Sequence, residues 1–271
     1  MSVQCTYPAY INGAPVTNTD LVPLAFSGFA HFTAMQVRNR EVRGLDLHLA
    51  RLKEASVILF GVILPDDRVR HEVRLAIKEG PTDQSLIVTV YPPEGEFTAK
   101  SMNVQPAILI RTGPPSDGPS GPLRLSIVEH ERFLPTIKHV GEGAKTYHLH
   151  RAVEQGFDDA VFTDRKGRLS EGTIWNLVFW DGSAVVWPKA EMLAGTMMGM
   201  IQRQLMRAGI PQRHEEIKPD NLAKFTGAAI MNSWTPGIAV TAIGSSSIQE
   251  SATFMKLLHS AHQAEPALAL P

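Results

Sequence analysis

The sequence predicts an α+β protein of two domains, and three observations support this fold class. Short apolar runs typical of strands are mixed with longer stretches that have helical periodicity. Their order lacks the regular strand–helix alternation of a doubly wound sheet. A proline- and glycine-rich run at 113–122 interrupts the pattern and is typical of a linker. We therefore expect a small N-terminal α/β domain over 1–112 and a larger C-terminal domain over 123–271.

The N-terminal part begins with a hairpin signal, because Asn12 and Gly13 lie between apolar runs. Apolar positions spaced by three, four or seven predict a helix over 45–60, and Asp46 near its start suits the helix dipole. The other elements expected here are strands at 32–37, 86–91 and 107–110, and a helix at about 65–79.

The C-terminal part contains three expected helices. The first covers about 142–155, and Gly156 follows it as a residue that suits the left-handed end of a helix. The second, 195–208, ends near Gly209, and the third covers 248–262. The strands expected here are 123–128, 159–163, 173–180, 228–232 and 238–243.

Composition excludes several classes of function. The formal net charge of −1 provides no field that would attract nucleic acid or an anionic membrane. The single cysteine, Cys5, allows neither an intramolecular disulfide nor a cysteine-based metal site, which favours a reducing compartment. Residues 1–4 lack the features of a secretory signal, and every apolar run is too short to span a bilayer. We therefore expect a cytoplasmic protein with no metal, nucleic-acid or membrane partner.

Four stretches carry residues suited to chemistry, although each alone has an ordinary structural interpretation. Arg51 offers a guanidinium that matches phosphate, but most helix arginines are simply solvated. Lys138 lies between a strand and a helix, where burial favours a Schiff base, but turn lysines are usually exposed. Glu171 can hold a ring nitrogen protonated or merely occupy a turn. Gly195 can expose helix amides to a phosphate or merely cap that helix.

Together, these four features match one cofactor. A phosphate-binding arginine, a Schiff-base lysine, a carboxylate for a pyridine nitrogen and a phosphate-binding helix start are what pyridoxal 5′-phosphate requires.

The order and spacing of these residues resemble the class IV (fold type IV) pyridoxal-phosphate enzymes. This family includes branched-chain aminotransferases, D-amino-acid aminotransferases and aminodeoxychorismate lyases. His48-x-x-Arg51-Leu52 is similar to the helix that carries the phosphate-binding arginine, and Glu171-Gly172-Thr173-x-x-Asn176 is similar to the segment with the pyridine-nitrogen glutamate. Leu193-x-Gly195 is similar to the segment where a leucine packs on the ring and two backbone amides hold the phosphate.

The resemblance implies a two-domain fold whose C-terminal domain is a mixed, barrel-like sheet with helices, and it implies a homodimer. The cofactor contacts that it implies are Arg51, Glu171, Leu193, Gly195, Thr196, Met197, Ser233 and Trp234. The substrate contacts that it implies are His31, Phe32, Thr33, Tyr91 and Thr235.

Two lysines compete as the covalent anchor. The family has a helix of about five turns between its lysine and a glycine that precedes the next strand. Gly156 follows Lys138 by 18 positions, which suits that helix, whereas Lys145 lies only 11 positions before it and falls inside the helix. The resemblance therefore favours Lys138 as the catalytic lysine.

The reaction that the resemblance implies is transfer of an amino group between an amino acid and a 2-oxo acid through a lysine Schiff base. A β-eliminating lyase of the aminodeoxychorismate type is the alternative, and Phe32-Thr33-Ala34 and Lys138-His139 favour that branch. A non-catalytic relative is a third hypothesis, because Met197-Met198 stands where the family often has Thr-Arg.

Overall fold

The computed structural model describes residues 7–22, 24, 28–78, 80–93 and 98–269. Residues 1–4 and Cys5, on which the expectation of a reducing compartment depends, lie outside these ranges. The chain forms two compact units. Unit 1 takes in Met1–Ser116, Ile137–Gly141 and Ala267–Pro271, and unit 2 takes in Asp117–Thr136 and Glu142–Pro266. This division differs from the contiguous one expected from the linker, because two later segments pair with strands of unit 1.

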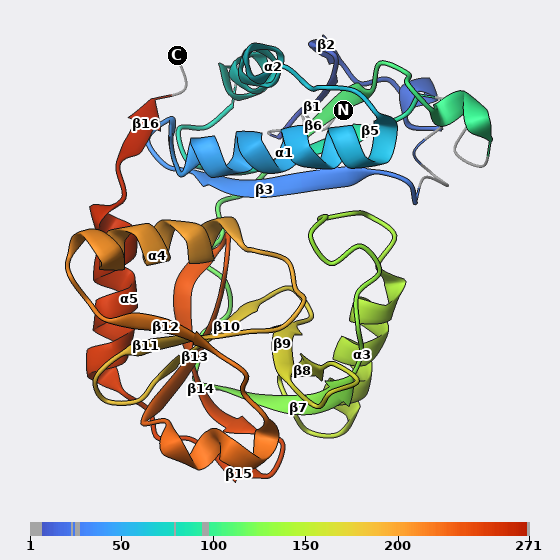
Figure 1. Cartoon of the computed structure of the whole chain (residues 1–271). Helices are drawn as coiled ribbons and strands as arrows, with labels where there is room; N and C mark the ends of the chain where they lie inside the picture. Colours follow the sequence, from blue (N-terminus) through green and yellow to red (C-terminus); the bar gives the residue numbers. More distant parts are fainter. Residues whose placement is uncertain (1–6, 23, 25–27, 79, 94–97, 270–271) are drawn as a thin grey trace. The chain divides into compact units, whose positions relative to one another are not determined.

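Unit 1 is an antiparallel sheet with two helices packed on it (Figure 1). Its strand order is β2-β1-β6-β5-β3. Burial alternates along β3 because period-2 side chains point to opposite faces, and the buried set packs against the helices. The elements are β1 Ala9–Ile11, β2 Ala14–Pro15, η1 Thr19–Leu21, β3 His31–Val37, β4 Glu41–Arg43, α1 Leu45–Phe60, α2 Asp66–Lys78, β5 Gln84–Tyr91, η3 Ala99–Ser101, β6 Ala107–Gly113 and β16 Ala267–Ala269.

The segment 137–141 belongs to unit 1 because it pairs with the start of β3. The backbone N–H of Phe32 donates to the carbonyl of Lys138 at 2.9 Å, and that of Val140 donates to Ala30 at 2.8 Å. An antiparallel bridge joins His31 to His139. Main-chain hydrogen bonds to β3 therefore fix the backbone of Lys138.

Unit 2 contains a closed ring of six strands. The order β10-β13-β14-β7-β8-β9 returns to β10 through the pair Asn176 and Glu171, which gives the barrel-like sheet that was expected. Strands β11 and β12 extend the sheet beyond β10. The elements are β7 Leu123–Glu129, α3 Gly143–Glu154, β8 Asp159–Thr163, β9 Leu169–Gly172, β10 Asn176–Trp180, β11 Val185–Pro188, α4 Thr196–Arg207, β12 Gln212–Glu215, η4 Pro219–Lys224, β13 Gly227–Asn232, β14 Thr235–Ile243, β15 Ser246–Ser247 and α5 Ala252–Ala264.

Most predicted elements are confirmed within a few residues, including the helix at 45–60 and the Asn12-Gly13 hairpin. The strand expected at 173–180 is wrong at its start. Residues 173–175 form a turn, closed by a 2.8 Å bond from the backbone N–H of Gly172 to the carbonyl of Trp175. The strand before that turn, β9, was not expected. Among the described residues, no helix combines the length and the apolar character that crossing a membrane requires.

Candidate functional site

Glu171 is a buried carboxylate at the point where β9 pairs with β10; the residue is 4% exposed. The backbone N–H of Leu193 donates a hydrogen bond to this carboxylate. The carbonyl of Leu193 accepts one from the side-chain amide of Asn176 at 2.8 Å. Because Asn176 is the cross-strand partner of Glu171, this strand pair holds Leu193 through both of its backbone groups. The predicted residues Glu171 and Leu193 are thus brought into contact.

Helix α4 begins directly after Gly195, and its first turn is buried. A β-carbon on Gly195 would lie 1.9 Å from the side-chain oxygen of Asn176, so only glycine fits there. No side chain caps the helix, and its first hydrogen bond runs from the N–H of Gly199 to the carbonyl of Gly195. The amides of Thr196 and Met197 therefore have no partner within the helix. Together with the helix dipole, they suit an anion.

Ser233 and Trp234, two of the cofactor contacts that the resemblance implies, lie in the turn between β13 and β14. The side-chain oxygen of Asn232 accepts from the backbone N–H of Trp234 at 2.8 Å, and Ser233 completes the turn. The ring of Trp234 packs edge-to-face on that of Trp175, with 6.1 Å between the centroids. Thr235, one residue later, is buried, and its hydroxyl donates to the carbonyl of Gly237 at 3.4 Å. Through Trp175, this turn is linked to the turn that follows Glu171.

Asp159 fixes the turn between β9 and β10. Its carboxylate accepts from the hydroxyl of Thr173 at 2.6 Å and from the indole N–H of Trp175 at 2.7 Å. The backbone N–H of Ala160 donates to it as well, at 2.7 Å. Burial raises the pKa of Asp159, and these hydrogen bonds oppose the shift. Asp159 therefore positions the turn that connects Glu171 to Asn176.

Within unit 2, Glu171 belongs to a cluster of four charged side chains. The guanidinium of Arg132 donates to Glu142 at 2.7 Å and lies 3.5 Å from a carboxylate oxygen of Glu171. The ammonium of Lys145 lies 2.9 Å from Glu142 and 3.9 Å from Glu171. The four side chains are between 3% and 16% exposed, so this is a buried cluster rather than a surface ion-pair network.

The two carboxylates of this cluster respond differently to their surroundings. Burial raises the pKa of Glu171 above its usual range, and the nearby Lys145 and Arg132 oppose that shift. Burial acts on Glu142 in the same direction, but its ion pairs with Lys145 and Arg132 hold its pKa below the usual range. Arg132 and Lys145 therefore interact more strongly with Glu142 than with Glu171.

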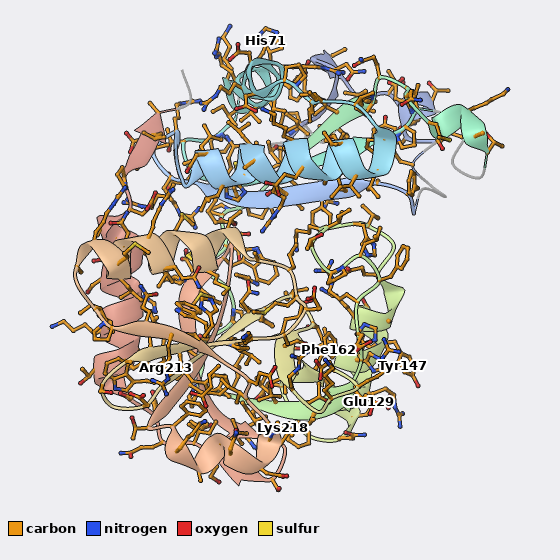
Figure 2. All side chains as sticks on the ribbon, in the orientation of Figure 1. His71, Glu129, Tyr147, Phe162, Arg213 and Lys218 are labelled. Carbon is orange, nitrogen blue, oxygen red and sulfur yellow. The ribbon has the colours of Figure 1, made fainter. Side chains whose placement is uncertain are left out.

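Packing of α3 places Lys145 on the covered face of the helix. Lys145 and Ala152 are the buried residues of α3, and the ring of His148 lies 5.8 Å from that of Phe162 on β8. Figure 2 labels Tyr147 on α3 and Phe162 on β8. Residues three apart share a helix face, so the contact of His148 with β8 fixes the direction of Lys145.

In unit 1, Lys138 lies over the ring of Phe32. Its ammonium is 4.7 Å from the ring centroid, within the range of a cation–π interaction. Arg51 lies on α1, partly buried, between His48 one turn before it and Ala55 one turn after it. Tyr91, at the end of β5, is buried beside Ala30 and Ala107.

His31 and Thr33 point to the face of β3 that α1 covers. A nitrogen of His31 lies 2.9 Å from the hydroxyl of Ser56, and the hydroxyl of Thr33 lies 2.6 Å from a nitrogen of His48. Both residues are fully buried. Because side chains alternate along a strand, only Phe32 of these three lies on the opposite face. We therefore correct the sequence-based assignment: within unit 1, His31 and Thr33 are packing residues.

Several functional candidates were not predicted from the sequence. The sequence did not indicate a role for Arg132, Glu142 or Asp159, and it indicated Asn176 only as part of a motif. The i,i+3 spacing of Glu142 and Lys145 was the one available signal, since it predicts an ion pair on a helix. Nothing local indicated that Arg132 would reach Glu171, 39 positions along the chain.

Comparisons with known proteins show the family of this chain and its fold. The family model "Amino-transferase class IV" matches residues 30–243. The branched-chain aminotransferase of Thermoproteus uzoniensis, solved with norvaline, is 16% identical, with 94% of this chain and 93% of that chain covered and a TM-score of 0.84. The branched-chain amino acid aminotransferase of Thermobaculum terrenum, solved in its PLP form, is 14% identical, with 95% and 92% covered and a TM-score of 0.81.

The 4-amino-4-deoxychorismate lyase of Pseudomonas aeruginosa is a similar structure of another activity. It is 21% identical, with 93% of this chain and 97% of that chain covered and a TM-score of 0.78. A search of curated protein sequences finds no match.

Proposed function

The chain belongs to the class IV aminotransferase family, and on this premise we propose that it is a pyridoxal-phosphate-dependent aminotransferase. Its substrates are an amino acid and a 2-oxo acid, and it works as a cytoplasmic homodimer. One observation carries the proposal most directly. Leu193 connects a buried carboxylate, Glu171, to the open start of α4 at Gly195. A carboxylate and an anion-binding helix end are the two groups that a phosphorylated pyridine requires.

The residues present fit this cofactor. Glu171 is an acceptor for a protonated ring nitrogen, and the amides of Thr196 and Met197 are donors for a phosphate. Gly195 lets the side chain of Asn176 approach the start of α4, which no β-carbon would allow. Arg51 adds a guanidinium for the phosphate, and Ser233 and Trp234 are further proposed cofactor contacts. When bound, pyridoxal phosphate provides the electron sink for the amino-group transfer.

We assign the covalent anchor to Lys138. The carbon that the lysine attacks and the ring nitrogen lie at opposite ends of a pyridine ring. An anchor lysine and the ring-nitrogen carboxylate must therefore be separated by that ring. The ammonium of Lys145 is only 3.9 Å from Glu171 and forms an ion pair with Glu142, which leaves no room for the ring between them. We therefore place the anchor at Lys138, whose backbone is held by β3.

The chain's own residues then divide the work. Lys138 would hold the cofactor covalently, and its Nζ would take a proton from the substrate Cα as general base and then donate it as general acid. Glu171 holds the proton on the ring nitrogen. Phe32, Tyr91 and Thr235 remain the proposed substrate contacts.

Visible absorbance that stays with the purified protein after unbound pyridoxal phosphate is removed tests the cofactor assignment, and Lys138→Ala should lose the band of the lysine-bound cofactor. Incubation with a panel of amino acids and 2-oxo acids then tests the reaction. Amino transfer supports the proposal. Pyruvate release from aminodeoxychorismate would instead assign the lyase activity, and neither product across a broad panel, without visible absorbance, would favour a non-catalytic relative.

A further inference from the structure

We propose that Lys145 is a positioning residue that keeps Glu171 ionised for the cofactor ring, and that Glu142 limits how much of the Lys145 charge acts on Glu171. This inference rests on the proposed function, because it concerns how Glu171 meets the ring nitrogen. It assigns roles to two residues outside the predicted site.

Geometry is the first support for this role. The ammonium of Lys145 bridges two carboxylates, at 2.9 Å from Glu142 and 3.9 Å from Glu171. Its side chain is 10% exposed. A lysine ammonium is strongly hydrated and is rarely buried without paired carboxylates. The two carboxylates therefore hold it in place.

Charge balance is the second support. The cluster contains two cations, Arg132 and Lys145, and two carboxylates, Glu142 and Glu171. Removing Lys145 would leave two buried carboxylates to share one guanidinium, and two such groups so placed do not both ionise easily. Arg132 donates to Glu142 at 2.7 Å but lies 3.5 Å from Glu171. Glu142 would keep the guanidinium, and Glu171 would take the proton.

Each packed element contributes charged or titratable groups to this balance. The segment after β7 contributes His130 and Arg132. The start and middle of α3 contribute Glu142, Lys145 and His148. The loop before α4 contributes the backbone N–H of Leu193, which faces Glu171. Burial and the neighbouring His148 and Lys145 lower the pKa of His130, so His130 is a poor substitute for the Lys145 charge. Because Arg132 donates to Glu142, Lys145 is the cation whose positive charge determines whether Glu171 is ionised.

The test compares two ligands that differ only at the ring nitrogen. The first is pyridoxal phosphate, and the second is its analogue in which a C–H replaces that nitrogen. Binding of each is titrated to the purified full chain at neutral pH for wild type, Lys145→Met, Glu142→Gln and the double variant. Lys256→Met, on an exposed position of α5, is the matched control.

We expect Lys145→Met to bind pyridoxal phosphate roughly tenfold more weakly, the scale of one charged hydrogen bond, and to bind the analogue as wild type does. The double variant restores the balance of Arg132 with Glu171, so it should regain most of the lost affinity. Glu142→Gln alone should bind pyridoxal phosphate at least as well as wild type. Lys256→Met should change neither affinity.

Three results would overturn the inference while leaving the proposed function intact. These are equal weakening of both ligands by Lys145→Met, no weakening of either, or a double variant no better than Lys145→Met. A wild-type chain that binds neither ligand would instead refute the proposed function, and this inference with it. Thermal unfolding of each apoprotein checks that the variants are folded before binding is compared.

Discussion

The side-chain oxygen of Asn176 lies 1.9 Å from the point where a β-carbon on Gly195 would be. The same side chain donates from its nitrogen to the carbonyl of Leu193 at 2.8 Å. Strand β10 and the start of α4 thus meet at a contact that tolerates no side chain at residue 195. The predicted anion site depends on this contact, because it sets the direction of the first helical turn.

Gly195→Ala should therefore destabilise the protein by about 1–3 kcal/mol, the usual range for overpacking a well-packed site. Asn176 must move, and its bond to Leu193 breaks. Denaturant unfolding of the apoprotein measures the loss. Gly143→Ala is the control, because nothing lies within 4 Å of the point where its β-carbon would be, and it should leave stability nearly unchanged. Equal stability of the two variants would contradict the account of residue 195.

Asp159 should act as the anchor of the turn at 173–175. Asp159→Ala leaves the buried indole N–H of Trp175 and the hydroxyl of Thr173 without their acceptor, which should cost about 2–4 kcal/mol in the free energy of unfolding. Thr173→Val removes only one of these bonds and should cost about 1 kcal/mol. Unfolding followed by tryptophan fluorescence compares them. If Asp159→Ala is no more harmful than Thr173→Val, the turn is held by other contacts.

Acid should destabilise the protein through the two histidines buried between β3 and α1. Burial lowers the pKa of His31 and of His48 from 6.5 to about 3. The unfolded chain binds these protons near pH 6.5, while the folded chain does not, so the stability present above pH 6.5 is lost as the pH falls towards 3. Each histidine should contribute a slope of about 1.4 kcal/mol per pH unit in this window.

Replacing one histidine isolates its share of that slope. Unfolding free energies of His31→Leu, measured between pH 6 and pH 4, should show a slope lower by about 1.4 kcal/mol per pH unit. His71→Leu, at an exposed position of α2 that Figure 2 labels, is the matched histidine-to-leucine control. An unchanged slope in His31→Leu would show that His31 titrates equally in the folded and unfolded chains.

Arg51 should act on the phosphate and not on the ring. Arg51→Gln removes a charge-assisted hydrogen bond, so it should weaken binding of pyridoxal phosphate roughly 10- to 100-fold. Binding of pyridoxal, which has no phosphate, should not change. Arg74→Gln on the exposed side of α2 is the control. Equal weakening of both ligands by Arg51→Gln would assign Arg51 a structural role.

The sequence predicted features that depend on local chemistry. The hairpin at Asn12-Gly13 was recognised because few residues tolerate its left-handed backbone, and Gly195 was recognised because glycine is acceptable at the start of a helix. Features that depend on distant partners were not recognised. The ring of strands in unit 2 closes through a single residue pair, Asn176 and Glu171. No periodic pattern in the sequence predicts such a pair.

The local sequence also could not predict which way the side chains of β3 point. The strand expected at 32–37 has two faces, but the sequence did not indicate which face α1 would cover. His31 and Thr33 were therefore expected at the substrate, although they lie in the packing beneath α1. Lys145 was considered only as a rival anchor, since its pairing with Glu171 requires the fold of α3 on β8.

The central claim is that Lys138, not Lys145, carries the cofactor, and one measurement tests it directly. Borohydride reduction of the wild-type chain with pyridoxal phosphate joins the cofactor permanently to the lysine that holds it, and mass spectrometry of the digested chain identifies that residue. We predict the added mass on Lys138 alone. The added mass on Lys145, or on no lysine, would contradict the account.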